Sequence, residues 1–161
     1  MVHDNHVTID TMTEPTPRIL ICANRTATTP ALLDAVRERA AAGPAEFHLV
    51  VPATPHGLHR VVDPEVAGLD EARANLAAAL PRLSQAARRQ VTGSVGDANP
   101  LCAVEDAMNL QGFDEIIIST LSRRFSRWLR LDLISKAAAL GVPVIHVAPG
   151  QVDSCVLPLA S

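Results

Sequence analysis

Short runs of apolar residues alternate along the chain with longer amphipathic stretches. The apolar runs predict five buried strands, at residues 18–23, 47–51, 90–95, 114–119 and 143–147. Helices are predicted between them: from Pro30 to Gly43, at residues 69–89, from Pro100 to Gly112, and one that ends at Gly141. Because the strands are apolar rather than alternating, the sequence predicts an α/β fold, a single doubly wound five-stranded parallel sheet with helices on both faces. The third strand, which is the least apolar, is expected at an edge.

Three regions of the chain depart from this alternation. Residues 1–16 are polar without periodicity and are expected to form a disordered leader to a single α/β domain at residues 17–149. Residues 52–69 predict a loop too long for a plain connector, and Pro81 is expected to kink or split the second helix. Residues 150–161 are expected to form a C-terminal tail, which either adds a short strand across a dimer or frays.

Charge and composition exclude several classes of protein. A net charge of −3 over 161 residues argues against a protein that mainly coats nucleic acid or an anionic membrane. No apolar run approaches the ~18–20 residues of a membrane span, and the N-terminus has no signal-peptide pattern. Three cysteines without a CxxC pair indicate free thiols, so a cytoplasmic location is expected. Lys136 is the only lysine and lies in no GxxxxGK motif, which disfavours P-loop chemistry.

Two loops are candidates for a binding site. In an open parallel sheet, ligands bind beyond the carboxyl ends of the strands where the strand order reverses. If that reversal lies between the first and fourth strands, residues 23–26 and 119–124 line the crevice. Their hydroxyls, amide and three guanidiniums suit a phosphate or another anion.

Over residues 17–149 the chain resembles the universal stress proteins. The resemblance is carried by ILICAN at the first strand, HLVVPA at the second, VGDANP before the third helix, EIIIST at the fourth strand and GVPVIHV at the last. It implies a doubly wound sheet, a homodimer joined through the last strand and, in one branch of the family, ATP bound at the switch point.

The residues of that ATP-binding branch are not all present. The branch carries an Asp after the first strand, where this chain has Asn24. It also carries Gly-x2-Gly-x9-Gly-(Ser/Thr) after the fourth strand. The three glycine positions here are Ser119, Ser122 and Asp132, and Leu133 follows them. Glycines let backbone amides approach phosphates closely, so these replacements weaken the phosphate cradle.

Arginines stand in the place of the missing glycines. Arg123, Arg124, Arg127 and Arg130 give this segment a local excess of positive charge. The segment is either a solvated basic turn or part of an anion or nucleotide site. Nucleic acid is not expected there, because Phe125 and Trp128 fall at packing positions rather than on a stacking platform.

The sequence therefore predicts a non-catalytic dimer that binds a small ligand, with ATP or AMP as candidate cofactors and no metal. Asn24 and the backbone of Val51 are expected to face an adenine-like group, and Ser119, Ser122, Arg123 and Arg124 an anionic part. A nucleotide-free dimer that presents the Arg/Trp segment and residues 52–69 to a protein partner is the alternative. Weak ATP hydrolysis, with Asp132 as the metal-binding carboxylate, is least supported. The complete candidate site comprises Ala23, Asn24, Val51, Ser119, Thr120, Ser122, Arg123, Arg124, Arg127 and Asp132.

Overall fold

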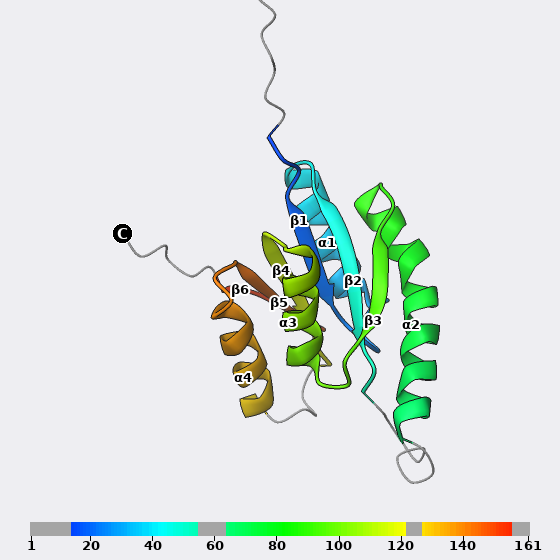
Figure 1. The fold of residues 1–161 in the computed structure, drawn as a ribbon. Coiled ribbons are helices and arrows are strands. Elements are labelled where there is room, and N and C mark those ends of the chain that lie inside the picture. Colours follow the sequence, from blue (N-terminus) through cyan, green and yellow to red (C-terminus); the bar gives the residue numbers. More distant parts are fainter. Residues whose placement is uncertain (1–13, 55–63, 122–126, 156–161) are drawn as a thin grey trace, which may run out of the picture.

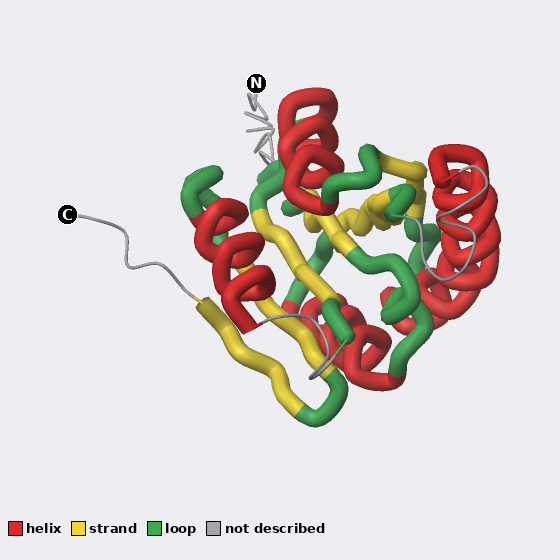
Figure 2. The backbone as a smooth tube through the Cα atoms, turned by 90° about the horizontal axis from the view of Figure 1, so that it is seen from below, coloured by secondary structure: helices red, strands yellow, loops and turns green. Residues whose placement is uncertain are grey.

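The computed structural model describes residues 14–54, 64–121 and 127–155 of the chain. They form one sheet with two helices on each face, as Figures 1 and 2 show. The strands are β1 (Arg18–Cys22), β2 (Glu46–Pro52), β3 (Thr92–Gly96), β4 (Glu115–Ser119), β5 (Val144–Ala148) and β6 (Gln151–Cys155). The helices are α1 (Pro30–Ala42), α2 (Pro64–Ala87), α3 (Pro100–Gln111) and α4 (Arg127–Ala138).

The strand order is β3-β2-β1-β4-β5-β6, and the first five of these are parallel. This confirms the predicted doubly wound sheet, including the reversal between β1 and β4 and the edge position of β3. Successive side chains of each strand point to opposite faces of the sheet and pack into two separate hydrophobic cores. Ile19 and Ile117 pack under α1 and α2, whereas Leu20 and Ile118 pack under α3 and α4.

A sixth strand lies within the predicted C-terminal tail, and it pairs inside the same chain. Gln151–Cys155 turns back after Gly150, whose φ of 85° suits a tight turn, and pairs antiparallel with β5. The stretch QVDSC has little apolar content, so its strand character comes from backbone pairing with β5. The strand predicted to join two protomers therefore has β4 on one side and β6 on the other. Residues 156–161 of the predicted tail lie outside the described residues.

Helix α2 differs from its prediction in two respects. It begins at Pro64 rather than near residue 69, and proline at a first helical position sacrifices no hydrogen bond. The helix also continues through Pro81, so it is not split there, which is one of the two predicted effects of this proline. Leu83 and Ala79 are fully buried on either side of Pro81, so packing against the sheet supports the helix there. The remaining part of the predicted loop, residues 55–63, and most of the leader, residues 1–13, lie outside the described residues.

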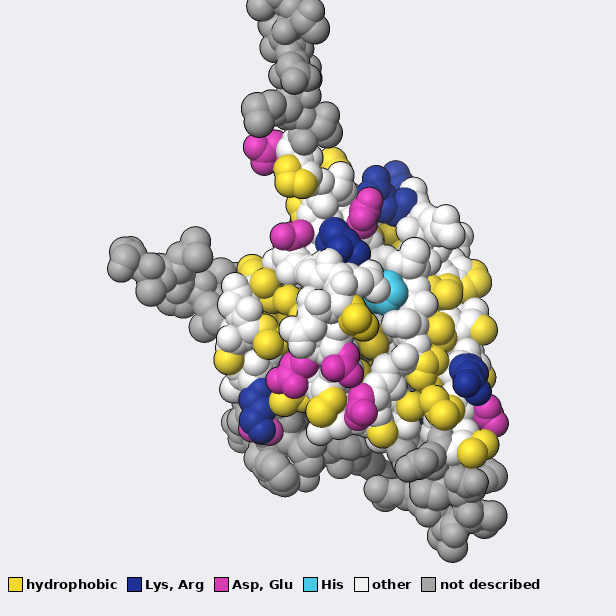
Figure 3. Space-filling model, in the orientation of Figure 1, with side chains coloured by type: hydrophobic (Ala, Val, Ile, Leu, Met, Phe, Trp, Pro, Cys, Tyr) yellow, Lys and Arg dark blue, Asp and Glu magenta, His cyan; other side chains and the backbone are white. Residues whose placement is uncertain are grey.

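No helix within the described ranges is both long and apolar enough to span a membrane. The face that carries α3 and α4 is drawn in Figure 3, where basic and acidic side chains are interspersed among apolar ones. The described basic side chains on this face are therefore scattered rather than gathered in one patch.

Candidate functional site

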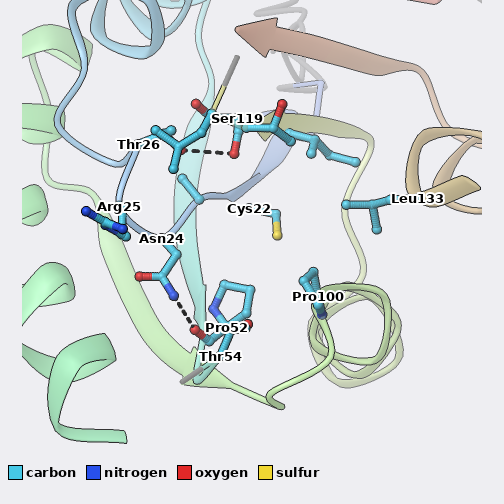
Figure 4. A pocket seen from close by; sticks show the side chains of 13 residues that line it. Cys22, Asn24, Arg25, Thr26, Pro52, Thr54, Pro100, Ser119 and Leu133 are labelled. Atoms are coloured by element: carbon cyan, nitrogen blue, oxygen red, sulfur yellow. Dashed lines mark hydrogen bonds between the residues drawn. The ribbon is translucent and has the colours of Figure 1, made fainter. Parts of the chain in front are cut away.

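A cavity of about 250 Å³ opens at the carboxyl ends of β1 and β4, where the strand order reverses. The loops after β1, β2 and β4 surround it, together with the first residue of α3 and one residue of α4, as Figure 4 shows. Its lining comprises Cys22, Ala23, Asn24, Arg25, Thr26, Pro52, Thr54, Pro100, Ile118, Ser119, Thr120, Leu121 and Leu133.

The walls of the cavity are largely apolar. Cys22 and Ile118 are buried on the sheet face that carries α3 and α4, while Pro100 and Leu133 come from those two helices. Burial raises the pKa of the Cys22 thiol to about 12. This thiol is therefore protonated near neutral pH, and Cys22 acts as an apolar wall residue rather than a nucleophile.

Asn24 is held on both sides of its amide. Its Nδ2 donates to the backbone oxygen of Pro52 at 2.8 Å, and its Oδ1 accepts from Nδ2 of Asn75 at 2.7 Å. These bonds tie the loop after β1 to the end of β2 and to α2. An aspartate at this position could not donate to Pro52, so the amide is needed for this arrangement.

Two threonine hydroxyls in the lining are used to join neighbouring loops. Thr26 Oγ1 donates to the backbone oxygen of Ser119 at 3.0 Å, which links the β1 and β4 loops. Thr54 Oγ1 donates to the backbone oxygen of Ala98 at 2.7 Å, which links the β2 and β3 loops. Both hydroxyl protons therefore point at protein carbonyls rather than into the cavity.

The end of β4 presents two hydroxyls with different surroundings. Ser119 Oγ is buried without a hydrogen-bond partner. Thr120 Oγ1 lies 2.8 Å from Nε2 of His146, a side chain of β5 that is only 7% exposed. A titratable group is thus in direct contact with a residue that lines the cavity.

Comparison with known proteins supports the fold. No protein-family model and no curated protein sequence matches the chain. Among solved structures, a universal stress protein from Burkholderia pseudomallei superposes with a TM-score of 0.58 at 19% identity, over 81% of this chain and 94% of that one. The chain has the universal stress protein fold. A universal stress protein in complex with cAMP matches with a TM-score of 0.57 at 17% identity, over 83% and 98% of the two chains. The universal stress protein from Archaeoglobus fulgidus in complex with dAMP matches with a TM-score of 0.52 at 14% identity, over 82% of this chain and 97% of that one.

Within this universal stress protein fold, the structure brings four of the predicted site residues together at the cavity: Ala23, Asn24, Ser119 and Thr120. Val51 is fully buried in the core under α1 and α2, and the neighbouring Pro52 lines the cavity instead. Asp132 is exposed, lies outside the lining and pairs with Lys136 at 2.9 Å. Ser122, Arg123 and Arg124 lie outside the described residues, as does the side chain of Arg127, the first residue of α4.

Sequence reasoning missed several residues around the cavity. Thr54 and Pro100 belong to it because the loops after β2 and β3 end at the same edge of the sheet as β1. His146 lies inside the strand predicted at residues 143–147, and its ring contacts Thr120 of the cavity lining. The sequence feature that indicates a role for His146 is its position as a polar residue inside an otherwise apolar strand. No group of metal-ligating side chains is present among the described residues.

Proposed function

We propose that this protein binds a small anionic ligand in the cavity between β1 and β4, with an adenine nucleotide such as ATP or AMP as the first candidate. The observation that carries the proposal is the position of the cavity at the reversal of strand order. Doubly wound sheets bind ligands at this point. Two solved structures with the same fold are complexes with cAMP and dAMP, which supports a nucleotide.

The two parts of the proposed ligand, its base and its anionic group, lie in different parts of the cavity. The apolar walls formed by Cys22, Pro100 and Leu133 suit the faces of a base. Arg25 lines the cavity and is exposed, so it is available to an anionic group. Arg123 and Arg124 follow Ser119 closely in the chain, and we place them beside the same group, in the role that the glycines have in the ATP-binding branch.

We further propose that the site binds its ligand without transforming it. The described lining contains no carboxylate, imidazole or lysine that could act as a general acid or base. Asp132, the carboxylate that a hydrolase would require for a metal ion, is paired with Lys136 and does not line the cavity. Magnesium-dependent phosphate release that is lost in Asp132→Ala would overturn this assignment.

The assembly and location are also proposals. We infer a cytoplasmic homodimer, in keeping with the free thiols of Cys22 and Cys102. β6 lies beyond β5 and forms this edge of the sheet, so we place the dimer contact on β6. Removal of residues 150–161 is expected to change the oligomeric state measured by light scattering, whereas removal of residues 1–13 is not.

One observation favours the alternative of a nucleotide-free interaction module. Asn24, Thr26 and Thr54 already use their side chains to bond other parts of the protein. A site whose polar groups are occupied in this way has fewer of them to offer a ligand. On this alternative the protein is a dimer whose stability does not respond to any nucleotide.

Titration calorimetry and thermal unfolding against ATP, ADP, AMP, cAMP and inorganic phosphate test the proposal. A bound nucleotide at ~100 times its Kd adds about 2.7 kcal/mol to the free energy of unfolding. We expect amide NMR signals of Ala23 and Thr120 to shift, and those of Thr92 on β3 to stay. Joint replacement of Arg123 and Arg124 by Ala should weaken binding. A lack of response to every compound would favour the interaction module.

A further inference from the structure

Thr120 differs from the other hydrogen-bonded threonines of the cavity in the nature of its partner. The hydroxyls of Thr26 and Thr54 donate to backbone carbonyls, which always accept. Thr120 Oγ1 instead lies 2.8 Å from Nε2 of His146, a ring nitrogen that accepts or donates according to its protonation. A proton on this ring therefore changes what Thr120 offers to a ligand.

Charged residues face His146 from the strands and the helix that pack against β5. His146 lies in register with Ile118 of β4 and with Asp153 of β6, so β6 places an acidic residue at the opposite position. Glu115, the acidic residue of β4, pairs with Arg39 of α1, which packs on the other face. The charged residues of α4, the helix on the same face, are Arg127, Arg130, Asp132 and Lys136, of which the last two pair with each other.

Protonation of His146 acts on the cavity in two ways. In the neutral ring with its proton on Nδ1, Nε2 accepts the Thr120 proton, and the Thr120 oxygen can only accept a hydrogen bond from a ligand. When the ring takes up a second proton, Nε2–H donates to Oγ1, and the Thr120 hydroxyl is released to donate to a ligand. The ring also gains a positive charge, and it is in contact with Thr120, a residue of the cavity lining. Both changes favour a ligand with negative charge.

We propose that His146, acting through Thr120, couples anion binding in this cavity to the uptake of a proton. His146 is a positioning residue, because it reaches the ligand through the Thr120 hydroxyl. The inference rests on the proposed function, in which the cavity binds a small anion. By linkage, a bound anion raises the proton affinity of His146 to the same extent that the proton raises the affinity for the anion.

Calorimetric titration with cAMP tests this coupling. The phosphodiester of cAMP keeps a single negative charge over the range in which histidine titrates, unlike the phosphate of AMP. We expect wild-type protein to bind cAMP on the order of tenfold more tightly at about pH 5.5 than at about pH 8. His146→Gln keeps a hydrogen-bonding side chain but does not titrate, and its cAMP affinity is expected to be independent of pH.

His48 provides a matched control. It is also a buried histidine of the sheet, but its ring contacts Thr92 and Ser94 of β3, which do not line the cavity. His48→Gln is expected to retain the pH dependence of cAMP binding. A wild-type affinity that is the same at both pH values, or a pH dependence that persists in His146→Gln, overturns the coupling and leaves the proposed function standing. Absence of cAMP binding at both pH values counts against the coupling and against the proposed function.

A measurement without ligand covers the case in which His146→Gln does not fold. Imidazole ¹⁵N spectra of wild-type protein at about pH 8 should show an unprotonated Nε2 on His146. Thr120→Val should move the titration midpoint of His146 and leave that of His48 unchanged. A neutral ring that carries its proton on Nε2, or an unmoved midpoint, contradicts the proposal.

Discussion

Asn75 of α2 donates through Nδ2 to Oδ1 of Asn24, the residue two positions after β1, at a distance of 2.7 Å. The other end of the Asn24 amide donates to the backbone oxygen of Pro52 at the end of β2. A single side chain thereby holds together three segments that are far apart in the sequence. It stands where the ATP-binding universal stress proteins carry an aspartate, so its amide nitrogen has a role here that a carboxylate lacks.

Asn24→Asp is therefore expected to destabilise the protein, although aspartate is the residue of the ATP-binding branch at this position. The carboxylate loses the donor to Pro52 and sets two oxygens against each other, at an expected cost of about 1–2 kcal/mol in the free energy of unfolding. Urea unfolding measures this cost, and Gln90→Glu, at an exposed position, supplies the same change of charge as a control. A variant as stable as wild type would show that the bond to Pro52 contributes nothing.

Thr120→Val and Ser119→Ala form a matched pair of hydroxyl deletions on adjacent residues. Thr120→Val breaks the bond to the buried His146 and is expected to lower the free energy of unfolding by about 1–2 kcal/mol. Ser119→Ala removes a buried hydroxyl that has no partner, so its stability should equal or exceed that of wild type. Thr120→Ser should recover most of the loss. Equal losses in Thr120→Val and Ser119→Ala would contradict this assignment of the bonds.

Gly96 at the end of β3 marks a close approach between the sheet and α3. A Cβ added there would lie 2.7 Å from Cβ of Ala103 and 2.8 Å from Cγ2 of Val50. Gly96→Ala should therefore cost about 1–3 kcal/mol through overpacking. Ala103→Gly removes one of the two clashing atoms, and the double variant should be more stable than the sum of the single losses predicts. Strict additivity in a chemical-unfolding cycle would argue against this contact.

His48 is expected to make the stability depend on pH in a defined direction. Burial first, and the charge of Arg18 second, lower the pKa of His48 in the folded protein. Below the ordinary histidine value of about 6.5, the unfolded chain binds more protons at this position than the folded one. Stability should then fall as the pH drops below about 6.5 and should not change through His48 above it. His48→Gln should flatten this slope in urea titrations at several pH values, and an unchanged slope would contradict the prediction.

The sequence by itself determined the alternation of strands and helices and the parallel sheet. These follow from local patterns, because an apolar run such as residues 116–118 has to be buried on both faces of a sheet whatever its partners are. The N-cap of α3 is equally local, since Asn99 accepts from the backbone nitrogen of Leu101 two residues further on. The edge position of β3 follows from its weak apolar content.

Tertiary structure alone decided the partners. β6 is stabilised by backbone pairing with β5, and its sequence has no apolar pattern that predicts a strand. Asn75 meets Asn24 across 51 residues, and His146 meets Thr120 across 26, because packing and register place them side by side. Hydropathy indicates which residues leave water, but a hydrogen bond depends on distances of a few tenths of an ångström between distant segments. For that reason the sequence located the edge of the sheet where the cavity opens, and only the folded chain decided which polar groups there remain available to a ligand.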